Sequence, residues 1–467
     1  MHEFDMDEFD VVVVGAGPAG EAAAGRCADG GLRVGLVERE LVGGECSFWG
    51  CVPSKTLIRP GDVLASARRV PGASAAVHGR LDVDAALAWR DEMTNGWHDD
   101  NALPWLDEKG ITLLRGTGRL TGEREVAVES ADGTRRVHAS RAVILAVGTG
   151  PFIPPVEGLR ELPPWDNRSA TSAKEAPRRL LVLGGGAVGV EMAQAFRRLG
   201  SEQVTVVEGL DRLLAREEPF AGDEVRAAFT AEGIGVVTGS RLERARRRGA
   251  DGPVVATLDD GREIEADEVL VAVGRRPSTR DLGLDAVGLE PGTVVDVDDR
   301  LRARGVPGGW LYAIGDCNGR APLTHMGKYH GRIAADVIRG RDVADRSSAR
   351  AVPRVTFTDP QVCAVGLTEA QARERGLPVR VATYDTGAVP GSYVLGRGIS
   401  GTAKIVVDER RRVLIGATFT GPALQELLHS ATVAVVGEVP LDTLWHAVPS
   451  FPTVSEVWVR LLETYGV

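Results

Sequence analysis

The sequence predicts an α/β fold in which one unit, a buried strand followed by a glycine-rich turn and a helix, occurs twice. The glycines stand at matching positions in the two copies, which are Gly15, Gly17 and Gly20 in the first and Gly184, Gly186 and Gly189 in the second. The chain of 467 residues is long enough for about three domains, and its 58 glycines and 25 prolines suit the many tight connections of this class.

The first copy has the order of elements that binds a dinucleotide. The apolar run at residues 10–14 predicts a buried strand, and residues 21–26 favour a helix directly after the turn. This order directs backbone N–H groups and a helix N-terminus at a pyrophosphate. Glu38 closes the next expected strand, at residues 33–37, where a carboxylate binds an adenosine ribose.

The second copy repeats this order. Residues 180–183 form its first expected strand, Glu191 falls in the following helix, and Glu208 closes the strand at residues 204–207. A glycine-rich turn of purely structural purpose is the alternative for either copy alone. Two copies in one chain predict two dinucleotides, one held tightly and one exchanging.

Cys46 and Cys51 lie in the segment 43–55, shortly after the first copy. On a regular helix, residues five apart have Cα atoms about 8.6 Å apart, beyond the roughly 7 Å limit for a disulfide. Pairing therefore requires a distorted turn, which Gly50 permits. Inert buried thiols and zinc ligands are the alternatives. No second cysteine or histidine pair stands nearby at metal spacing, so the sequence favours a redox pair and predicts no metal site.

Segment 43–55 resembles the redox-active disulfide of the pyridine nucleotide-disulfide oxidoreductases, a family that includes dihydrolipoyl dehydrogenase, glutathione reductase and mercuric reductase. Other segments extend the resemblance over nearly the whole chain, and these are 146–150, 273–277, 311–316, 323–326, 357–360 and 365–369. The resemblance implies two Rossmann-like dinucleotide-binding domains, for FAD and for NAD(P), followed by a C-terminal α+β dimerisation domain.

The same segments imply the domain boundaries. Residues 1–157 and 281–349 are expected to bind FAD, and residues 158–280 to form an inserted NAD(P)H-binding domain. Residues 350–467 are expected to form the interface of a homodimer.

The resemblance also implies a route for electrons. Hydride passes from the nicotinamide through the flavin to the Cys46–Cys51 disulfide, with Cys51 nearest the flavin and Cys46 as the exposed interchange thiol. Lys55 is expected beside the flavin, paired with Glu191. The other residues expected at the cofactors are Gly15, Gly17, Gly20, Glu38, Gly44, Thr149, Gly150, Asp316 and His325 for FAD, and Gly184, Gly186, Gly189, Glu208 and Gly274 for the nicotinamide nucleotide.

Glu208 predicts which nicotinamide nucleotide is used. A carboxylate at this strand end accepts the ribose hydroxyls of NADH and repels the 2′-phosphate of NADPH. We therefore expect NADH, with NADPH as the less favoured alternative because Arg212 lies close by in the sequence.

The C-terminal segment departs from the family pattern. Disulfide-reducing members carry a histidine before Pro-Thr, with a glutamate five residues after it, and this histidine protonates the leaving thiol. Here Pro452, Thr453 and Glu456 match, but the histidine position holds Phe451, which cannot transfer a proton. His446 does not align with the missing base, and we interpret it as a packing or surface residue.

The sequence accordingly predicts an FAD-dependent NAD(P)H oxidoreductase with a redox-active dithiol and an unidentified small-molecule acceptor, either a disulfide or another compound. One alternative is a quinone or electron-acceptor reductase that uses the flavin directly. Another is a flavoprotein with a mainly structural or interaction role, in which the cysteine pair is idle. Mercuric reductase activity is not expected, because no metal-binding module precedes the first glycine turn and no cysteine pair stands near the C-terminus.

Charge and composition exclude other classes. The net charge of -10 provides no basic face for nucleic acid, and no apolar run approaches the roughly 18 residues that span a membrane. The first ten residues lack the features of a secretory signal, and a pair of cysteines among only five is typical of catalysis in a reducing compartment. We therefore expect a cytoplasmic protein.

Residues 61–115 are expected to be helical. This segment contains three regularly spaced tryptophans, Trp89, Trp97 and Trp105. Their large apolar area favours positions in the core. Cys27, Cys317 and Cys363 have no partners at useful spacing and are expected to be core or incidental thiols.

Overall fold

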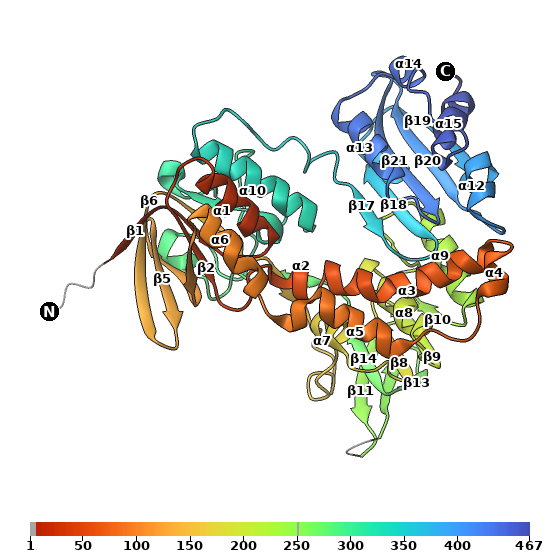
Figure 1. Ribbon diagram of the computed structural model, residues 1–467, viewed down its shortest axis with the longest axis horizontal. Helices are drawn as coiled ribbons and strands as arrows, with labels where there is room; N and C mark the ends of the chain where they lie inside the picture. The colour runs from red at the N-terminus through yellow and green to blue at the C-terminus, as the bar shows by residue number, and fades with distance from the viewer. Residues whose placement is uncertain (1–5, 250–251) are drawn as a thin grey trace. The chain divides into compact units, whose positions relative to one another are not determined.

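The computed structural model describes residues 6–249 and 252–467 (Figure 1). The chain divides into two compact units, and each is built from three stretches of sequence. The first unit combines the stretch that ends at Pro53 with Asp91–Pro151 and Arg275–Ser348. The second unit combines Ser54–Arg90, Phe152–Gly274 and Ala349–Val467.

The first unit is centred on a seven-stranded sheet of order β3-β2-β1-β6-β5-β4, with β16 paired to β6. Strands β1, β2, β3 and β16 run parallel to their neighbours, whereas β4, β5 and β6 form an antiparallel meander. The strands are β1 (Asp7–Val14), β2 (Val34–Glu38), β3 (Thr112–Arg115), β4 (Thr117–Gly122), β5 (Glu125–Ser130), β6 (Gly133–Leu145) and β16 (Leu311–Ala313), with a separate pair β7 (Thr149–Pro151) and β15 (Arg275–Pro277).

Helices α1 (Pro18–Ala28) and α10 (Thr324–Ile338) lie side by side in this unit (Figure 1). Their small residues allow the close approach, since a Cβ at Gly331 would lie 2.6 Å from the Ala19 carbonyl oxygen. The apolar strand β1 is buried between its neighbours, as its valine run predicts. The shorter helices of the unit are α2 (Gly44–Phe48) and α6 (Leu103–Lys109).

The second unit contains a parallel four-stranded sheet of order β10-β9-β8-β14 and an antiparallel sheet of order β11-β12-β13. The helix after β8 is buried on all sides over residues 189–196, and it completes the strand, turn and helix order of the second glycine motif. The elements are β8 (Arg179–Leu183), α8 (Ala187–Arg198), β9 (Gln203–Glu208), α9 (Pro219–Ala231), β10 (Gly235–Thr238), β11 (Leu242–Arg247), β12 (Val254–Leu258), β13 (Glu263–Ala266) and β14 (Glu268–Val271). Helices α3 (Cys51–Arg69), which begins in the first unit, α4 (Ala73–Ala76), α5 (Val83–Met93), which ends there, and α7 (Asn167–Ser172) come earlier in the chain.

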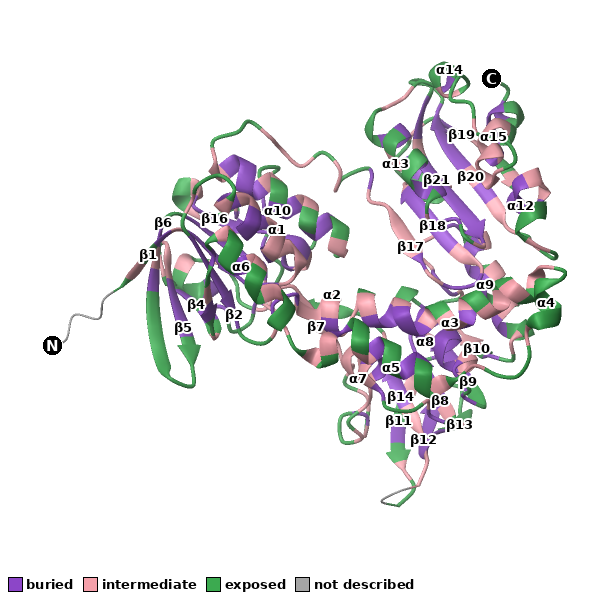
Figure 2. Cartoon of the chain, viewed as in Figure 1, coloured by how far each residue is buried: buried purple, intermediate pink, exposed green. Residues whose placement is uncertain are grey.

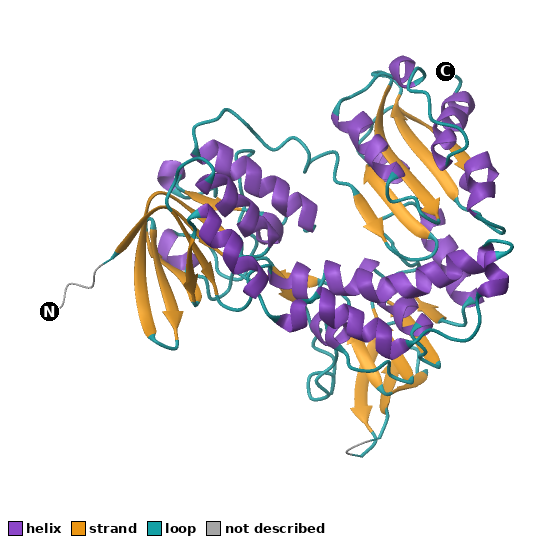
Figure 3. Ribbon diagram, viewed as in Figure 1, coloured by secondary structure: helices purple, strands orange, loops and turns teal. Residues whose placement is uncertain are grey.

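The C-terminal part of the second unit is an antiparallel sheet of order β17-β18-β21-β20-β19, packed with helices into a separate core. Strands β20 and β21 are largely buried (Figure 2), and helices and strands alternate irregularly along this part of the chain (Figure 3), which is an α+β arrangement. Its elements are β17 (Arg354–Thr356), β18 (Gln361–Gly366), α11 (Glu369–Glu374), β19 (Val379–Asp385), α12 (Pro390–Leu395), β20 (Thr402–Asp408), β21 (Val413–Gly421), α13 (Leu427–Val436), α14 (Leu441–Leu444) and α15 (Val457–Tyr465).

The predicted fold class is therefore confirmed, with two strand, glycine-turn and helix units and a C-terminal α+β part. The tryptophan prediction was only partly correct. Trp105 packs against the core of the first unit, but Trp89 remains 40% exposed, because α5 turns Ala86, Leu87 and Arg90 inward and leaves position 89 on the opposite side. Cys27, Cys317 and Cys363 are buried in the cores, as expected.

Candidate active site

The two cysteines of segment 43–55 stand on either side of a break between two helices. Cys46 lies within α2, α2 ends at Phe48, and α3 begins at Cys51. A Cβ at Gly50 would lie 3.0 Å from the Glu45 carbonyl oxygen and 3.3 Å from the Cys46 Cα, so only glycine fits here without displacing the backbone. The break and Gly50 together bring the chain back toward Cys46, which is the distortion that the spacing of the cysteines required.

Both sulfurs are thiols in this structure, and the Thr324 hydroxyl contacts each of them. The Thr324 Oγ1 atom lies 3.2 Å from the Cys46 Sγ and 3.2 Å from the Cys51 Sγ. A hydrogen bond with Cys51, together with burial, raises the pKa of Cys46, and the bond from Thr324 opposes that rise. Burial and the bond with Cys51 therefore favour the neutral form of Cys46.

A chain of polar contacts ties the redox segment to two residues that the sequence predicts at FAD. Arg275 forms an ion pair with Glu45, which directly precedes Cys46, and donates from Nε to the Thr149 hydroxyl at 2.8 Å. The Thr149 hydroxyl in turn donates to Asp316 at 2.8 Å. Burial raises the pKa of Asp316, and the bond from Thr149 opposes this rise. The contacts of Arg275 and Glu45 gave no signal in the sequence, because the two residues are far apart along the chain.

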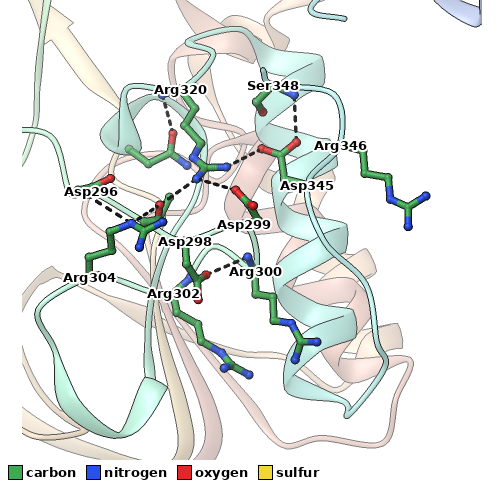
Figure 4. Close-up of polar contacts among 12 residues, drawn as sticks. Asp296, Asp298, Asp299, Arg300, Arg302, Arg304, Arg320, Asp345, Arg346 and Ser348 are labelled. Carbon is green, nitrogen blue, oxygen red and sulfur yellow. Dashed lines mark hydrogen bonds and ion pairs between the residues drawn. The ribbon is translucent and has the colours of Figure 1, made fainter. Parts of the chain in front are cut away.

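The turn that follows Asp316 is anchored by Arg320. Its guanidinium group lies between Asp345, at 3.1 Å, and Asp299, at 3.2 Å, and also donates to the Val297 carbonyl at 2.8 Å (Figure 4). The Asp345 side chain is almost wholly buried, so this contact compensates a charge that would otherwise be costly to bury. Arg320 thereby stabilises the loop that carries Asp316.

The first glycine turn fits a dinucleotide. Gly17 occupies the N-cap of α1, no side chain among the described residues caps that helix end, and a Cβ at Gly17 would meet nothing within 4 Å. At the end of β2, the Glu38 carboxylate accepts the backbone N–H of Ala16 at 2.8 Å and that of Glu40 at 2.8 Å. An uncapped helix N-terminus and a carboxylate at the neighbouring strand end match the pyrophosphate and ribose of FAD.

The second glycine turn reproduces these contacts. Gly186 occupies the N-cap of α8, again with no side-chain cap, and Glu208 accepts the N–H of Gly185 at 2.6 Å and that of Leu210 at 2.8 Å. The two glutamates therefore hold their respective glycine turns in the same way. The shared geometry fits a second dinucleotide at the end of β9.

Two arginines near Glu208 differ in their surroundings. The Arg212 guanidinium donates to the Ala215 carbonyl at 2.8 Å and so helps to close its own loop. Arg241 is exposed and lies against the strand end, since a Cβ at Gly209 would be 3.1 Å from its Nε. The sequence identified Arg212 but missed Arg241. Arg241 comes close to the end of β9 only because β9 and β10 pair in the sheet.

The expected pair of Lys55 and Glu191 is present in the second unit. Lys55 Nζ lies 2.6 Å from Glu191 Oε2 and 5.0 Å from the centroid of the Phe357 ring. The other Glu191 oxygen accepts the Phe357 backbone N–H at 2.9 Å. The buried glutamate is thus satisfied by one cation and one amide, and it holds the Lys55 ammonium in a defined position.

The remaining predicted residues lie in several places. His325 is exposed near the start of α10. Gly150 lies in β7 and pairs with Arg276 of β15, and Gly274 directly precedes that strand. In the C-terminal part, the Phe451 side chain is 74% exposed and His446 is exposed as well. Glu456 has one carboxylate oxygen that is buried and has no hydrogen-bond partner among the described residues.

Two dinucleotide folds and a dithiol in one chain define a nicotinamide-dependent flavoprotein oxidoreductase. The chain matches the family described as pyridine nucleotide-disulphide oxidoreductase over residues 9–331, and the dimerisation domain of that family over residues 352–462. The chain therefore belongs to the pyridine nucleotide-disulphide oxidoreductase family.

Relatives of this chain can be aligned over most of its length. A mercuric reductase of Lysinibacillus sphaericus is 30% identical over 455 residues, which cover 96% of this chain and 81% of that protein. A dihydrolipoyl dehydrogenase of Chlamydia pneumoniae is 34% identical over 462 residues, covering 97% of this chain and 96% of that protein.

Among solved structures, the Cu(II) complex of the HOCl-induced flavoprotein disulfide reductase RclA from Escherichia coli aligns with a TM-score of 0.86 at 25% identity, covering 98% of this chain and 99% of RclA. LpdA from Mycobacterium tuberculosis aligns with a TM-score of 0.85 at 27% identity, covering 99% of this chain and 100% of LpdA.

The predicted enzyme class and cofactors are thereby confirmed at the level of the family. The chain is an NAD(P)H-dependent flavoenzyme of the disulfide oxidoreductase type, with FAD and a pyridine nucleotide as cofactors. When bound, FAD would supply the redox chemistry that links hydride transfer from the nicotinamide to the reduction of sulfur. Among residues 6–249 and 252–467, no helix is long and apolar enough to cross a membrane, and no group of three or more His, Cys, Asp or Glu residues is arranged to hold a metal ion.

Proposed function

We propose that this enzyme passes reducing equivalents from NADH through FAD to the Cys46–Cys51 pair and then to an acceptor that needs no general acid at position 451. The observation that carries the proposal is the placement of both sulfurs around one hydroxyl, in a chain whose aligned acid position holds phenylalanine. In this proposal Cys51 is the thiolate next to the flavin and Cys46 is the interchange thiol. Lys55, oriented by Glu191, lies beside the flavin.

The cofactor contacts proposed from the sequence have structural support. The glycine turns, Glu38 and Asp316 support FAD in the first unit, and Glu208 supports the nicotinamide nucleotide in the second. NADH is favoured over NADPH because Glu208 carries a negative charge at the ribose position and because Arg212 is occupied by its own loop. Arg241 lies against the same strand end, and its positive charge opposes that preference, so Arg241→Ala should strengthen the preference for NADH.

The acceptor follows from the chemistry that Phe451 lacks. Reduction of an ordinary disulfide releases a thiolate whose conjugate thiol has a pKa of about 8.5. Such a thiolate leaves readily only when a general acid protonates it. A metal ion or a quinone accepts electrons without that step. Soft thiolate ligands favour copper, and the solved structure of RclA is named as a Cu(II) complex, so Cu(II) is the second candidate acceptor.

Mercuric ion is a less favoured acceptor, although several relatives are named mercuric reductases. Cys363 is the cysteine nearest to the C-terminus, and it is fully buried. We further propose that the enzyme is a cytoplasmic homodimer. The dimerisation domain supports the dimer, as do the exposed apolar side chains of Val448 and Phe451 in that domain. The domain boundaries given by the sequence remain part of this proposal.

Anaerobic titration of the purified protein with NADH tests the proposal. A working dithiol gives a long-wavelength thiolate-to-flavin band after two electrons, whereas an idle pair gives only bleaching of the flavin. Cys51→Ser should abolish the band, while Cys46→Ser should keep it, since the Cys51 thiolate remains. Bleaching without a band in the wild-type enzyme would exclude the dithiol route and favour direct reduction of an acceptor by the flavin.

A panel of acceptors then separates the candidates. Cu(II), a quinone, lipoamide and glutathione disulfide should be compared under the same NADH concentration. Wild-type turnover of either disulfide at a kcat/KM near ~10⁶–10⁸ M⁻¹s⁻¹, the upper range for enzymes, would show that another group supplies the proton. His446 is the first residue to substitute in that event.

A further inference from the structure

One hydroxyl group serves both sulfurs of the dithiol. Thr324 is the first residue of α10, and its Oγ1 lies 3.2 Å from the Cys46 Sγ and 3.2 Å from the Cys51 Sγ. All three residues belong to the first compact unit. Neither the spacing of the cysteines nor the glycine motifs assigned any role to Thr324.

A hydroxyl has one proton to donate and two lone pairs that accept. It can donate that proton to an anionic sulfur and at the same time accept the S–H of the other sulfur. A hydrogen bond donated to the charged form of a group stabilises that form, and such charge-assisted bonds are stronger than neutral ones. The N-terminus of a 15-residue helix adds a partial positive charge at the same place.

We propose that Thr324 is a positioning residue of the redox reaction. Its hydroxyl donates to Cys46 while both sulfurs are thiols, and after reduction it donates to the sulfur left anionic and accepts from the sulfur that keeps its proton. The step balances as follows. The disulfide takes up an electron pair and one proton, the S–S bond breaks, and the products are one thiolate and one thiol. The hydride donor of this enzyme class supplies the electron pair. The inference rests on the proposed function of the Cys46–Cys51 pair.

The surroundings of the sulfurs explain why this contact matters. Burial and the side-chain bond with Cys51 oppose ionisation of Cys46, whereas the bond from Thr324 and a backbone hydrogen bond with Cys51 favour it. The ionisable groups within about two turns of these atoms along the same elements are Glu45 on α2, Lys55 and Arg59 on α3, and His325, Lys328, Tyr329 and His330 on α10. Of these, Glu45 is engaged with Arg275, and Lys55 with Glu191.

Two substitutions separate the hydroxyl from the shape of the side chain. Thr324→Val keeps the volume and removes the hydroxyl, and Thr324→Ser keeps the hydroxyl and removes the methyl group. Thr230→Val is the matched control, because the Thr230 hydroxyl donates to a carbonyl of its own helix on the exposed side of α9. The FAD absorbance of each purified holoenzyme shows whether the variant retains its fold.

The readout is the alkylation of each cysteine by iodoacetamide between pH 6 and pH 10, measured by mass spectrometry after reduction with a phosphine. For the cysteine that reduction leaves anionic, Thr324→Val should raise the pH of half-maximal alkylation by about one unit. Its alkylation at neutral pH should then be roughly tenfold slower. The long-wavelength band of the reduced enzyme should titrate at a higher pH by the same amount. Thr324→Ser and Thr230→Val should match the wild type.

An unchanged alkylation profile in an FAD-bound Thr324→Val variant would overturn the inference. An equal shift in Thr324→Ser would do the same, because it would assign the effect to packing. The phosphine reduces the pair without NADH. Failure of NADH to reduce the dithiol would therefore reject the proposed function while leaving the alkylation result to decide on Thr324.

Discussion

Glu208 provides the sharpest test of cofactor choice, because its carboxylate does two separable things. It accepts the backbone N–H groups of Gly185 at 2.6 Å and Leu210 at 2.8 Å, which shapes the turn for any nicotinamide nucleotide. It also places a negative charge where the ribose of the nucleotide is proposed to bind. Glu208→Ala removes both effects, and only the second distinguishes NADH from NADPH.

The sizes of the two effects can be worked out separately. A hydrogen bond to a charged group is worth about 1.5–3 kcal/mol, so the loss of the turn contacts should lower kcat/KM for both nucleotides by roughly tenfold to a hundredfold. Two unit charges about 5 Å apart in water repel by about 0.8 kcal/mol. A 2′-phosphate with nearly two charges is therefore repelled by about 1.6 kcal/mol. Relief of that repulsion should narrow the preference for NADH by at least about tenfold.

The assay is steady-state kcat/KM for NADH and NADPH with a fixed acceptor, for the wild type and Glu208→Ala. Glu38→Ala is the matched control, since Glu38 holds the first glycine turn by the same two kinds of contact. It should weaken retention of FAD and leave the ratio between the two nucleotides unchanged. A wild type that prefers NADPH by tenfold or more, or an unchanged ratio in Glu208→Ala, would refute the reasoning.

Two further predictions concern the acceptor side and the flavin side. Phe451→His should raise turnover of lipoamide-type or glutathione-type disulfides by about a hundredfold, the lower end of general acid catalysis. Glu456→Gln in the same background should remove most of that gain. Steady-state rates of Phe451→His that stay at the wild-type level would argue against a missing acid at this position. Arg275→Met should weaken FAD binding severalfold in reconstitution of the apoprotein, because Thr149 loses the donor that orients it toward Asp316. An unchanged dissociation constant for FAD would show that Asp316 needs no such support.

Much of the nucleotide-binding framework could be predicted because it depends on residues that are close together in the sequence. A glycine required by a positive φ or by close backbone contact leaves a local mark, as at Gly15, whose φ is 102°. Gly20 leaves the same mark, because a Cβ there would lie 1.9 Å from the Gly15 carbonyl oxygen. The break at Gly50 between the two cysteines was predictable for the same reason, from helix geometry alone.

The contacts of Thr324, Arg275 and Arg241 could not be predicted in this way. Each joins elements that are distant in the sequence, such as α2 with α10 or β9 with the loop after β10, and no local spacing records such a pairing. The exposed position of Trp89 shows the same limit, since the apolar area of a tryptophan favours burial but only the packing of α5 determines which of its faces is buried.

The sequence by itself determined the chemistry that this protein can perform, because the cysteine pair, the glycine turns and the strand-end glutamates act through local backbone geometry and side-chain type. Only the tertiary structure decided how that chemistry is adjusted. It placed one hydroxyl against both sulfurs and linked Glu45 to Asp316 through Arg275 and Thr149. The physical reason is that hydrogen bonds and ion pairs act over about 3 Å, and only folding brings residues hundreds of positions apart within that distance.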